Sequence, residues 1–202
     1  KNLTYSSDLM ILSFIKSAIK DYDSVAILNK EVLKTARESM GTDKSPFMAG
    51  CYRGIAKIAV KEKNYKKADS LYNLSLEMYK KIIGEKNLST ISTYFDYCKL
   101  LLKMNDINKA HEIVLNNLEI LNKNFNEDIW GIAEGKSLLG EIYMKRKEFT
   151  VAENLLLKSY SSYKKEFGEN DFHTKEVAQK LVRLYTGWNK KGKADYYLSI
   201  LK

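Results

Sequence analysis

Gly135-Lys136-Ser137 matches part of a nucleotide-binding motif. The motif of a phosphate-binding loop ends in glycine, lysine and serine or threonine, and its backbone N–H groups and lysine hold the phosphates. That loop needs another glycine five positions before Gly135, where Trp130 stands. It also joins a strand to a helix, whereas this run lies inside a predicted helix. We therefore expect no nucleotide site here.

Two histidines and two cysteines are the other residues that could hold a metal or act as nucleophiles: His111, His173, Cys51 and Cys98. They are widely separated along the chain, so there is no spacing typical of metal ligands or of a nucleophile with its base. Two cysteines are also too few for a disulfide framework. The sequence therefore predicts a protein that is not an enzyme and that holds no metal and no cofactor.

The elements that carry these residues repeat every 42 positions. Three columns at this period are Ala68, Ala110, Ala152 and Ala194; Ala56, Cys98, Gly140 and Val182; and Ala59, Leu101, Tyr143 and Tyr185. Small residues recur where two helices cross, because interaxial distances of about 8 to 10 Å leave little room for side chains. Cys98 is thus expected to be a core residue. The alternative is a set of ordinary amphipathic helices with coincidental spacing.

A single proline in the chain favours helices nearly throughout. The pattern predicts helices near 6–20, 24–40, 46–63, 65–83, 89–103, 107–123, 129–147, 149–167 and 174–188, with a short final helix from 194. Runs at 40–41, 82–85, 124–127 and 166–169 contain glycine or asparagine. Both residue types tolerate the left-handed conformation that ends a helix, so these runs are predicted helix ends.

The stretch 138–168 resembles the signature of a tetratricopeptide repeat (TPR), through Leu139, Gly140, Tyr143, Phe149, Ala152, Leu155 and Ser159. Gly168-Glu169-Asn170 with Thr174 is similar to the loop of the 42-residue kinesin-light-chain type, with Asp171-Phe172 in place of the usual His-Pro. The resemblance implies an all-α fold, a right-handed α-solenoid of about five helix-turn-helix repeats near 5–41, 46–84, 88–126, 129–168 and 173–202. We expect one domain over 1–202. HEAT or armadillo repeats are the structural alternative.

The resemblance also implies a binding function. TPR proteins hold a peptide in a concave groove lined by the first helix of each pair. The positions that match this lining are Arg53, Lys57, Phe95, Lys99, Ser137, Glu141, Gln179 and Arg183. Basic and apolar residues together suit an extended or helical peptide with some negative charge. The alternative for this lining is a solvated polar face.

The net charge of +9 is concentrated in the turn inside each predicted pair. Windows 61–67, 103–109, 145–151 and 187–193 hold Lys61, Lys63, Lys66, Lys67, Lys103, Lys109, Lys145, Arg146, Lys147, Lys190, Lys191 and Lys193. We call these twelve residues the turn cations. They could compensate the negative C-terminal ends of helices. The alternatives are an acidic partner, nucleic acid or an anionic membrane surface.

The sequence predicts a scaffold that docks a protein or peptide partner. There are two functional alternatives. One is a regulatory or peptide-sensing module of a larger signalling protein, and the other is a basic adaptor for nucleic acid. No segment has the run of about 18 apolar residues that spans a bilayer, and no signal peptide opens the chain, so a cytoplasmic location is expected. A removed targeting signal is the alternative, because the chain starts at Lys1.

The last predicted helix should leave an apolar face uncovered at the end of the solenoid, through which the chain could pack on a partner. This face consists of Tyr196, Tyr197, Ile200 and Leu201.

Overall fold

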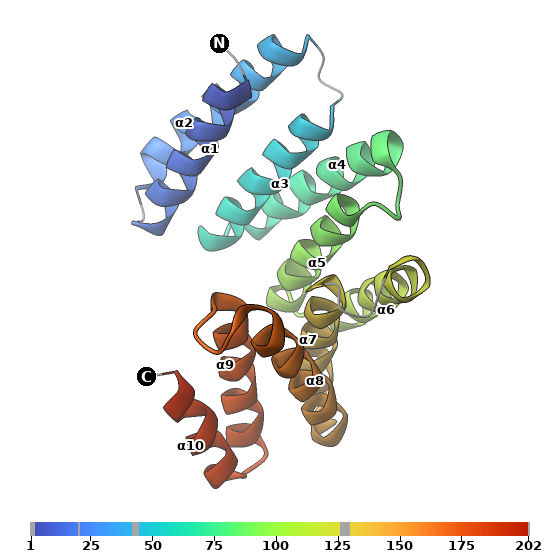
Figure 1. Cartoon of the computed structure of the whole chain (residues 1–202). Coiled ribbons are helices and arrows are strands. Elements are labelled where there is room, and N and C mark those ends of the chain that lie inside the picture. Colours follow the sequence, from blue (N-terminus) through green and yellow to red (C-terminus); the bar gives the residue numbers. More distant parts are fainter. Residues whose placement is uncertain (1–2, 20, 42–44, 126–129, 202) are drawn as a thin grey trace. The chain divides into compact units, whose positions relative to one another are not determined.

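The computed structural model describes residues 3–19, 21–41, 45–125 and 130–201. These residues form ten helices and no strand, which confirms the all-α prediction. The first helices of the five pairs are α1 (Leu3–Ala18), α3 (Pro46–Lys61), α5 (Leu88–Lys103), α7 (Trp130–Lys145) and α9 (Phe172–Gly187). The second helices are α2 (Tyr22–Met40), α4 (Tyr65–Ile83), α6 (Ile107–Asn124), α8 (Phe149–Phe167) and α10 (Lys191–Ile200). Figure 1 shows the two helices of a pair running in opposite directions.

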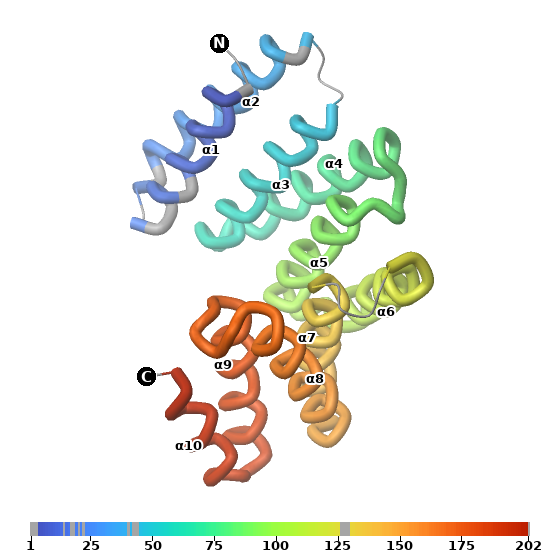
Figure 2. Tube along the Cα trace, viewed as in Figure 1, coloured from blue at the N-terminus to red at the C-terminus, as the bar shows by residue number. Residues whose placement is uncertain are grey.

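The chain divides into two compact units, residues 1–100 and 101–202, with the division inside α5. In the first unit α1 packs on α2, α3 packs on α4, and α3 also contacts both helices of the preceding pair. In the second unit α7 packs on α8 and α9 on α10, while α6 contacts α7 and α8 contacts α9. Figure 2 follows the chain through these pairs. The single domain predicted over 1–202 stays a prediction.

Each unit has its own apolar core. In the first unit Val32, Ala36, Met48 and Cys51 form a buried cluster. In the second unit the buried cluster includes Ala152, Leu156, Leu181, Leu184 and Tyr185. Both cysteines are buried thiols outside any disulfide, as the prediction for Cys98 requires, and burial raises the pKa of the Cys51 thiol to about 11.

The turn inside the pair has one geometry in the second to fifth repeats. Lys63, Asn105, Lys147 and Asn189, again 42 residues apart, have φ between 58° and 64°. The next residue donates its backbone N–H five residues back in every case, as Asn64 does to Ala59 and Glu148 to Tyr143, both at 2.9 Å. This is the Schellman ending, whose left-handed residue favours glycine or asparagine.

Replacing Lys147 by asparagine should therefore stabilise the protein. A side chain other than glycine, asparagine or aspartate costs about 1 kcal/mol or more in the left-handed region, so we expect a gain of roughly 0.5 to 1 kcal/mol. Lys147 is exposed, so no packing is lost. Urea unfolding should show the gain as a higher midpoint at unchanged slope. Lys145→Asn removes the same charge from the last residue of α7, and an equal gain there would contradict this explanation.

The connections between pairs are closed by glycine and threonine. Gly41, Gly84 and Gly168 have φ of 63°, 85° and 88°, which confirms three predicted helix ends. α6 ends at Asn124 as expected, and the rest of that predicted end lies partly outside the described residues. Thr90 donates its hydroxyl to the carbonyl oxygen of Gly84, and Thr174 donates to Gly168, both at 2.8 Å. The threonine thus holds the start of the next pair against the end of the previous one.

The final helix is better covered than the sequence predicted. Tyr197 is buried, and its ring lies 5.5 Å from the ring of Tyr160 and 5.8 Å from that of Tyr185. Ile200 and Leu201 are half-buried against the same core. The expectation of an uncovered face was wrong for these residues, because α10 turns them toward α9. Tyr196 stays exposed, and packing of this helix on a partner stays a prediction.

Candidate functional site

Among the described residues of the first helices, the buried charged side chains are Asp96 on α5 and Lys180 on α9. Their exposed fractions are 6% and 4%, and they stand 84 residues apart, in the same column of the repeat. A buried charge is costly unless it is paired and hydrogen-bonded, so each must be surrounded by partners. These partners include five of the eight residues predicted to line the groove.

The Asp96 cluster consists of Asp96, Arg53, Lys57 and Lys99, all in the first unit. Both Nε and an outer nitrogen of Arg53 lie within 2.7 Å of one carboxylate oxygen of Asp96. The Nζ atoms of Lys57 and Lys99 lie 3.6 Å and 4.0 Å from the carboxylate. Arg53 also donates to the backbone carbonyl oxygen of Ser92 at 3.3 Å. The sequence predicted Arg53, Lys57 and Lys99 but missed the carboxylate that brings them together.

The Asp96 cluster carries a net charge of +2, since three cations surround one carboxylate. The side chains of Arg53, Lys57 and Lys99 are 26%, 45% and 37% exposed. Asp96 is buried beneath them and orients their polar ends. The arrangement can therefore attract an anionic group from solvent without burying an uncompensated charge.

The Lys180 cluster consists of Lys180, Ser137, Glu141 and Glu176, all in the second unit. The ammonium of Lys180 lies 3.0 Å from the hydroxyl of Ser137, 3.1 Å from the carboxylate of Glu141 and 3.9 Å from that of Glu176. Burial alone would raise the pKa of Glu141, but Lys180, with further help from Arg183 and Lys145, lowers it below its usual value. This cluster ties α7 to α9, and its one cation is already paired with two carboxylates of the same unit.

The predicted lining residues therefore fall into different environments. Phe95 is fully buried and Ser137 is 4% exposed, so a ligand-contacting role does not fit either of them. Glu141 is half-buried against Lys180, while Gln179 and Arg183 are exposed on α9. Asp96 and Lys180 were missed because a charged residue in a helical pattern is usually assigned to the surface. One signal was available in the sequence. Asp96 and Lys180 occupy the same position of the 42-residue repeat as Gly54 and Leu138, which are residue types typical of a helix interface.

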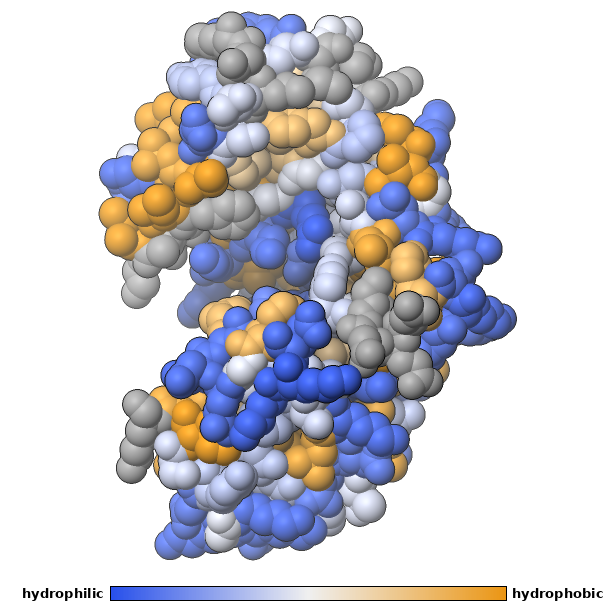
Figure 3. Space-filling view, in the orientation of Figure 1, coloured by the Kyte–Doolittle hydropathy of each residue, from blue (hydrophilic) through white to orange (hydrophobic). Residues whose placement is uncertain are grey.

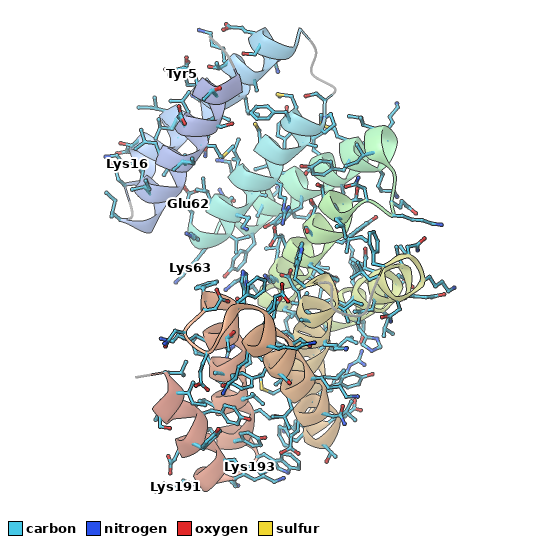
Figure 4. The ribbon with its side chains drawn as sticks, in the orientation of Figure 1. Tyr5, Lys16, Glu62, Lys63, Lys191 and Lys193 are labelled. Carbon is cyan, nitrogen blue, oxygen red and sulfur yellow. The ribbon has the colours of Figure 1, made fainter. Side chains whose placement is uncertain are left out.

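Several turn cations have partners within the chain. Lys193 lies 2.7 Å from Glu153, which also accepts a hydrogen bond from Tyr185. Arg146 donates to Asn108 at 3.0 Å. The ammonium of Lys190 lies 3.2 Å from the centre of the Trp188 ring. Figure 4 shows Lys191 and Lys193 at the start of α10.

Other turn cations lie at helix ends. Lys61, Lys103 and Lys145 each stand in the last turn of a first helix, where a positive charge offsets the negative end of the helix dipole. This position, together with the partners of Lys193, Arg146 and Lys190, favours a structural role for these residues over a single ligand-binding ridge.

Two surface depressions in the first unit offer room for small groups. One of about 400 Å³ is lined in part by Tyr52, Leu74 and Met78, and another of about 290 Å³ by Met10, Phe47 and Cys51. Neither contains a nucleophile beside a base, and burial raises the pKa of the Cys51 thiol, which keeps it protonated.

Within the residues that the structure describes, no three His, Cys, Asp or Glu side chains gather as metal ligands. Among the described helices, none is long and apolar enough to span a bilayer.

The comparisons with known proteins place the fold. No family model matches the sequence, and neither does any curated protein. Among solved structures, BtubC (BKLC) from P. vanneervenii has a TM-score of 0.75 at 16% identity, covering 96% of this chain and 76% of that one. A Podosopora anserina protein, described as a kinesin light chain with nearly identical TPR-like repeats, has a TM-score of 0.71 at 12% identity, covering 100% and 95%. A variant of it gives 0.72 at 12% identity, covering 98% and 93%. The chain therefore has the fold of a TPR-like α-solenoid.

Proposed function

We propose that this chain is a non-enzymatic interaction module that binds an acidic segment of a partner protein on the face formed by α3 and α5. The observation that carries the proposal is the Asp96 cluster, in which three partly exposed cations surround one buried carboxylate. Stacked helix pairs present extended surfaces that are suited to binding peptides. The TPR-like fold supports a scaffold role in the same way.

Charge and geometry make an acidic peptide the best ligand for this face. Arg53 already uses two nitrogens on Asp96, so it is held in place before a ligand arrives. Lys57 and Lys99 lie farther from Asp96, and a lysine can donate in three directions. Two aspartate or glutamate residues of a partner would complete the neutralisation of this cluster, since its net charge is +2. The one cation of the Lys180 cluster is already paired with two carboxylates of its own unit, so we assign this cluster a structural role.

Reversing the charge of Lys57 and Lys99 together should abolish binding of acidic peptides. The probes are fluorescent peptides selected on the intact chain from a random library, and anisotropy at moderate salt measures their affinity. Lys66→Glu with Lys67→Glu is the matched control, since it changes the charge of the same unit equally at two exposed turn positions. We expect this control to slow association while leaving the complex stable.

Two results would remove the proposal. One is equal binding by the Lys57/Lys99 variant and the parent chain. The other is loss of binding in the Lys66/Lys67 control alone, with strongly salt-dependent binding of labelled single-stranded or duplex nucleic acid, which would favour the adaptor alternative. A regulatory module of a larger signalling protein would use the same face, and the sequence that flanks this chain in its gene distinguishes that possibility. A pull-down with the intact chain, followed by mass spectrometry, would name the partner.

A further inference from the structure

The outer face of α1 exposes more apolar surface than the final helix does, and the proposed peptide site does not use it. Ile11, Leu12 and Ile15 are 59%, 42% and 54% exposed, and Ile19, which directly follows the last residue of α1, is 66% exposed. Figure 3 shows the corresponding hydrophobic patch over the α1 and α2 pair. Exposed apolar patches of this kind mark interaction surfaces.

Five residues of this face are ordered symmetrically about Leu12: Tyr5, Asp8, Leu12, Lys16 and Ile19. Tyr5 and Ile19 lie seven positions before and after Leu12, and Asp8 and Lys16 lie four positions before and after it. Steps of four and seven residues return to the same side of a helix. The described members of this set are exposed or half-buried, whereas Ser6 and Ser13 on the other side are buried. Figure 4 shows Tyr5 and Lys16 near opposite ends of α1.

Such an order is self-complementary for two antiparallel copies of the helix. A two-fold axis at Leu12 would bring Leu12 against itself, Tyr5 against Ile19 of the second copy, and Asp8 against Lys16 of the second copy. In an isologous interface each of the two contacts away from the axis occurs twice. Opposite charges at matching distances from the centre fix the register, while the apolar residues supply most of the binding free energy.

We propose that a second copy of this chain covers this face through antiparallel pairing of α1 with α1 about Leu12. Lys16 already lies 3.0 Å from Asp21, and its remaining donors can reach Asp8 of the second copy. A helix of 16 residues is about 24 Å long, so the interface lies at the small end for stable complexes and the dimer should form at micromolar concentrations or above. This inference does not depend on the proposed peptide site.

Sedimentation analysis from low-micromolar to near-millimolar concentration tests the pairing. The parent chain should show a monomer–dimer equilibrium, and Leu12→Asp, which places two charges on the axis, should be monomeric throughout. Leu115→Asp on α6 is the matched control, because Leu115 is 43% exposed and Leu12 is 42% exposed. Ile15→Asp gives a second test at a neighbouring position. Circular dichroism should show the same helix content in all of these variants.

A charge exchange tests the register. Asp8→Lys should weaken the dimer about tenfold, because it creates two like-charged contacts, and adding Lys16→Glu should restore most of the loss. A parent chain that stays monomeric at the highest concentration overturns the proposal. So does a dimer that survives Leu12→Asp, and so does a double variant no tighter than Asp8→Lys alone.

Discussion

Replacing Lys180 by alanine is expected to lower the free energy of unfolding by about 3 to 5 kcal/mol. Lys180 is 5% exposed in its side chain and is the closest cation to Glu141, at 3.1 Å. Its removal leaves a largely buried carboxylate without its main counter-charge and deprives the Ser137 hydroxyl of its donor at 3.0 Å. Urea or thermal unfolding measures the loss.

Another Lys–Glu pair supplies the control. Lys193 lies 2.7 Å from Glu153, but the lysine side chain is 54% exposed. An exposed pair contributes about 0 to 1 kcal/mol, so Lys193→Ala should cost little. Lys180→Met combined with Glu141→Leu should recover much of the stability lost in Lys180→Ala, because it removes both charges together. Equal small losses in the two alanine variants would show that the burial of Lys180 is energetically unimportant.

The pH dependence of stability should change in the same variants. Lys180 and its basic neighbours lower the pKa of Glu141 in the folded protein. The resulting stability is present above the unfolded-state pKa of a glutamate and is lost as the pH falls through the lower folded-state value. Glu141→Gln should therefore flatten the acid side of the stability profile, and an unchanged profile would contradict this pairing.

Gly140→Leu should be the most damaging single substitution in the helix crossings. A Cβ atom at Gly140 would lie 2.6 Å from Cγ of Leu156 and 3.4 Å from the carbonyl oxygen of Ala152. Neither α7 nor α8 can move freely, because α7 also contacts α6 and α8 contacts α9. Overpacking typically costs about 1 to 3 kcal/mol, and we expect the upper part of that range. Ala152→Leu should follow the same trend, since Ala152 is fully buried.

Gly187→Leu is the matched control for this crossing. Gly187 is also helical, and a Cβ atom added there would have no neighbour within 4 Å, so a side chain at this position meets open space. Helix propensity favours leucine over glycine by several tenths of a kcal/mol, so this variant should melt at or above the parent temperature. Adding Leu156→Ala to Gly140→Leu should recover part of the lost stability. Parent-like melting of both Gly140→Leu and Ala152→Leu would mean that the assigned repeat register is wrong.

Local chemistry explains which parts of the fold were predictable. A helix, its period and its ends depend on neighbouring residues, so the pairing of helices and the positive-φ glycines at 41, 84 and 168 followed from spacing and residue type. The observed helix limits differ from the predicted ones by no more than a few residues, with the largest shifts at α1 and α10. The left-handed lysines at 63 and 147 were not anticipated, because lysine is an unusual choice for that conformation.

The candidate site shows where such prediction stops. Lys57, Lys99 and Arg183 were assigned to a binding face by their place in the repeat, as were Phe95 and Ser137. The sequence by itself determined an all-helical chain of 42-residue helix pairs, because that pattern is local and repeats. Only the tertiary structure decided that Asp96 and Lys180 are buried and that Phe95 and Ser137 belong to the interior. Burial depends on side chains brought together from helices about 40 residues apart, as the 43-residue separations of Arg53 from Asp96 and of Ser137 from Lys180 illustrate.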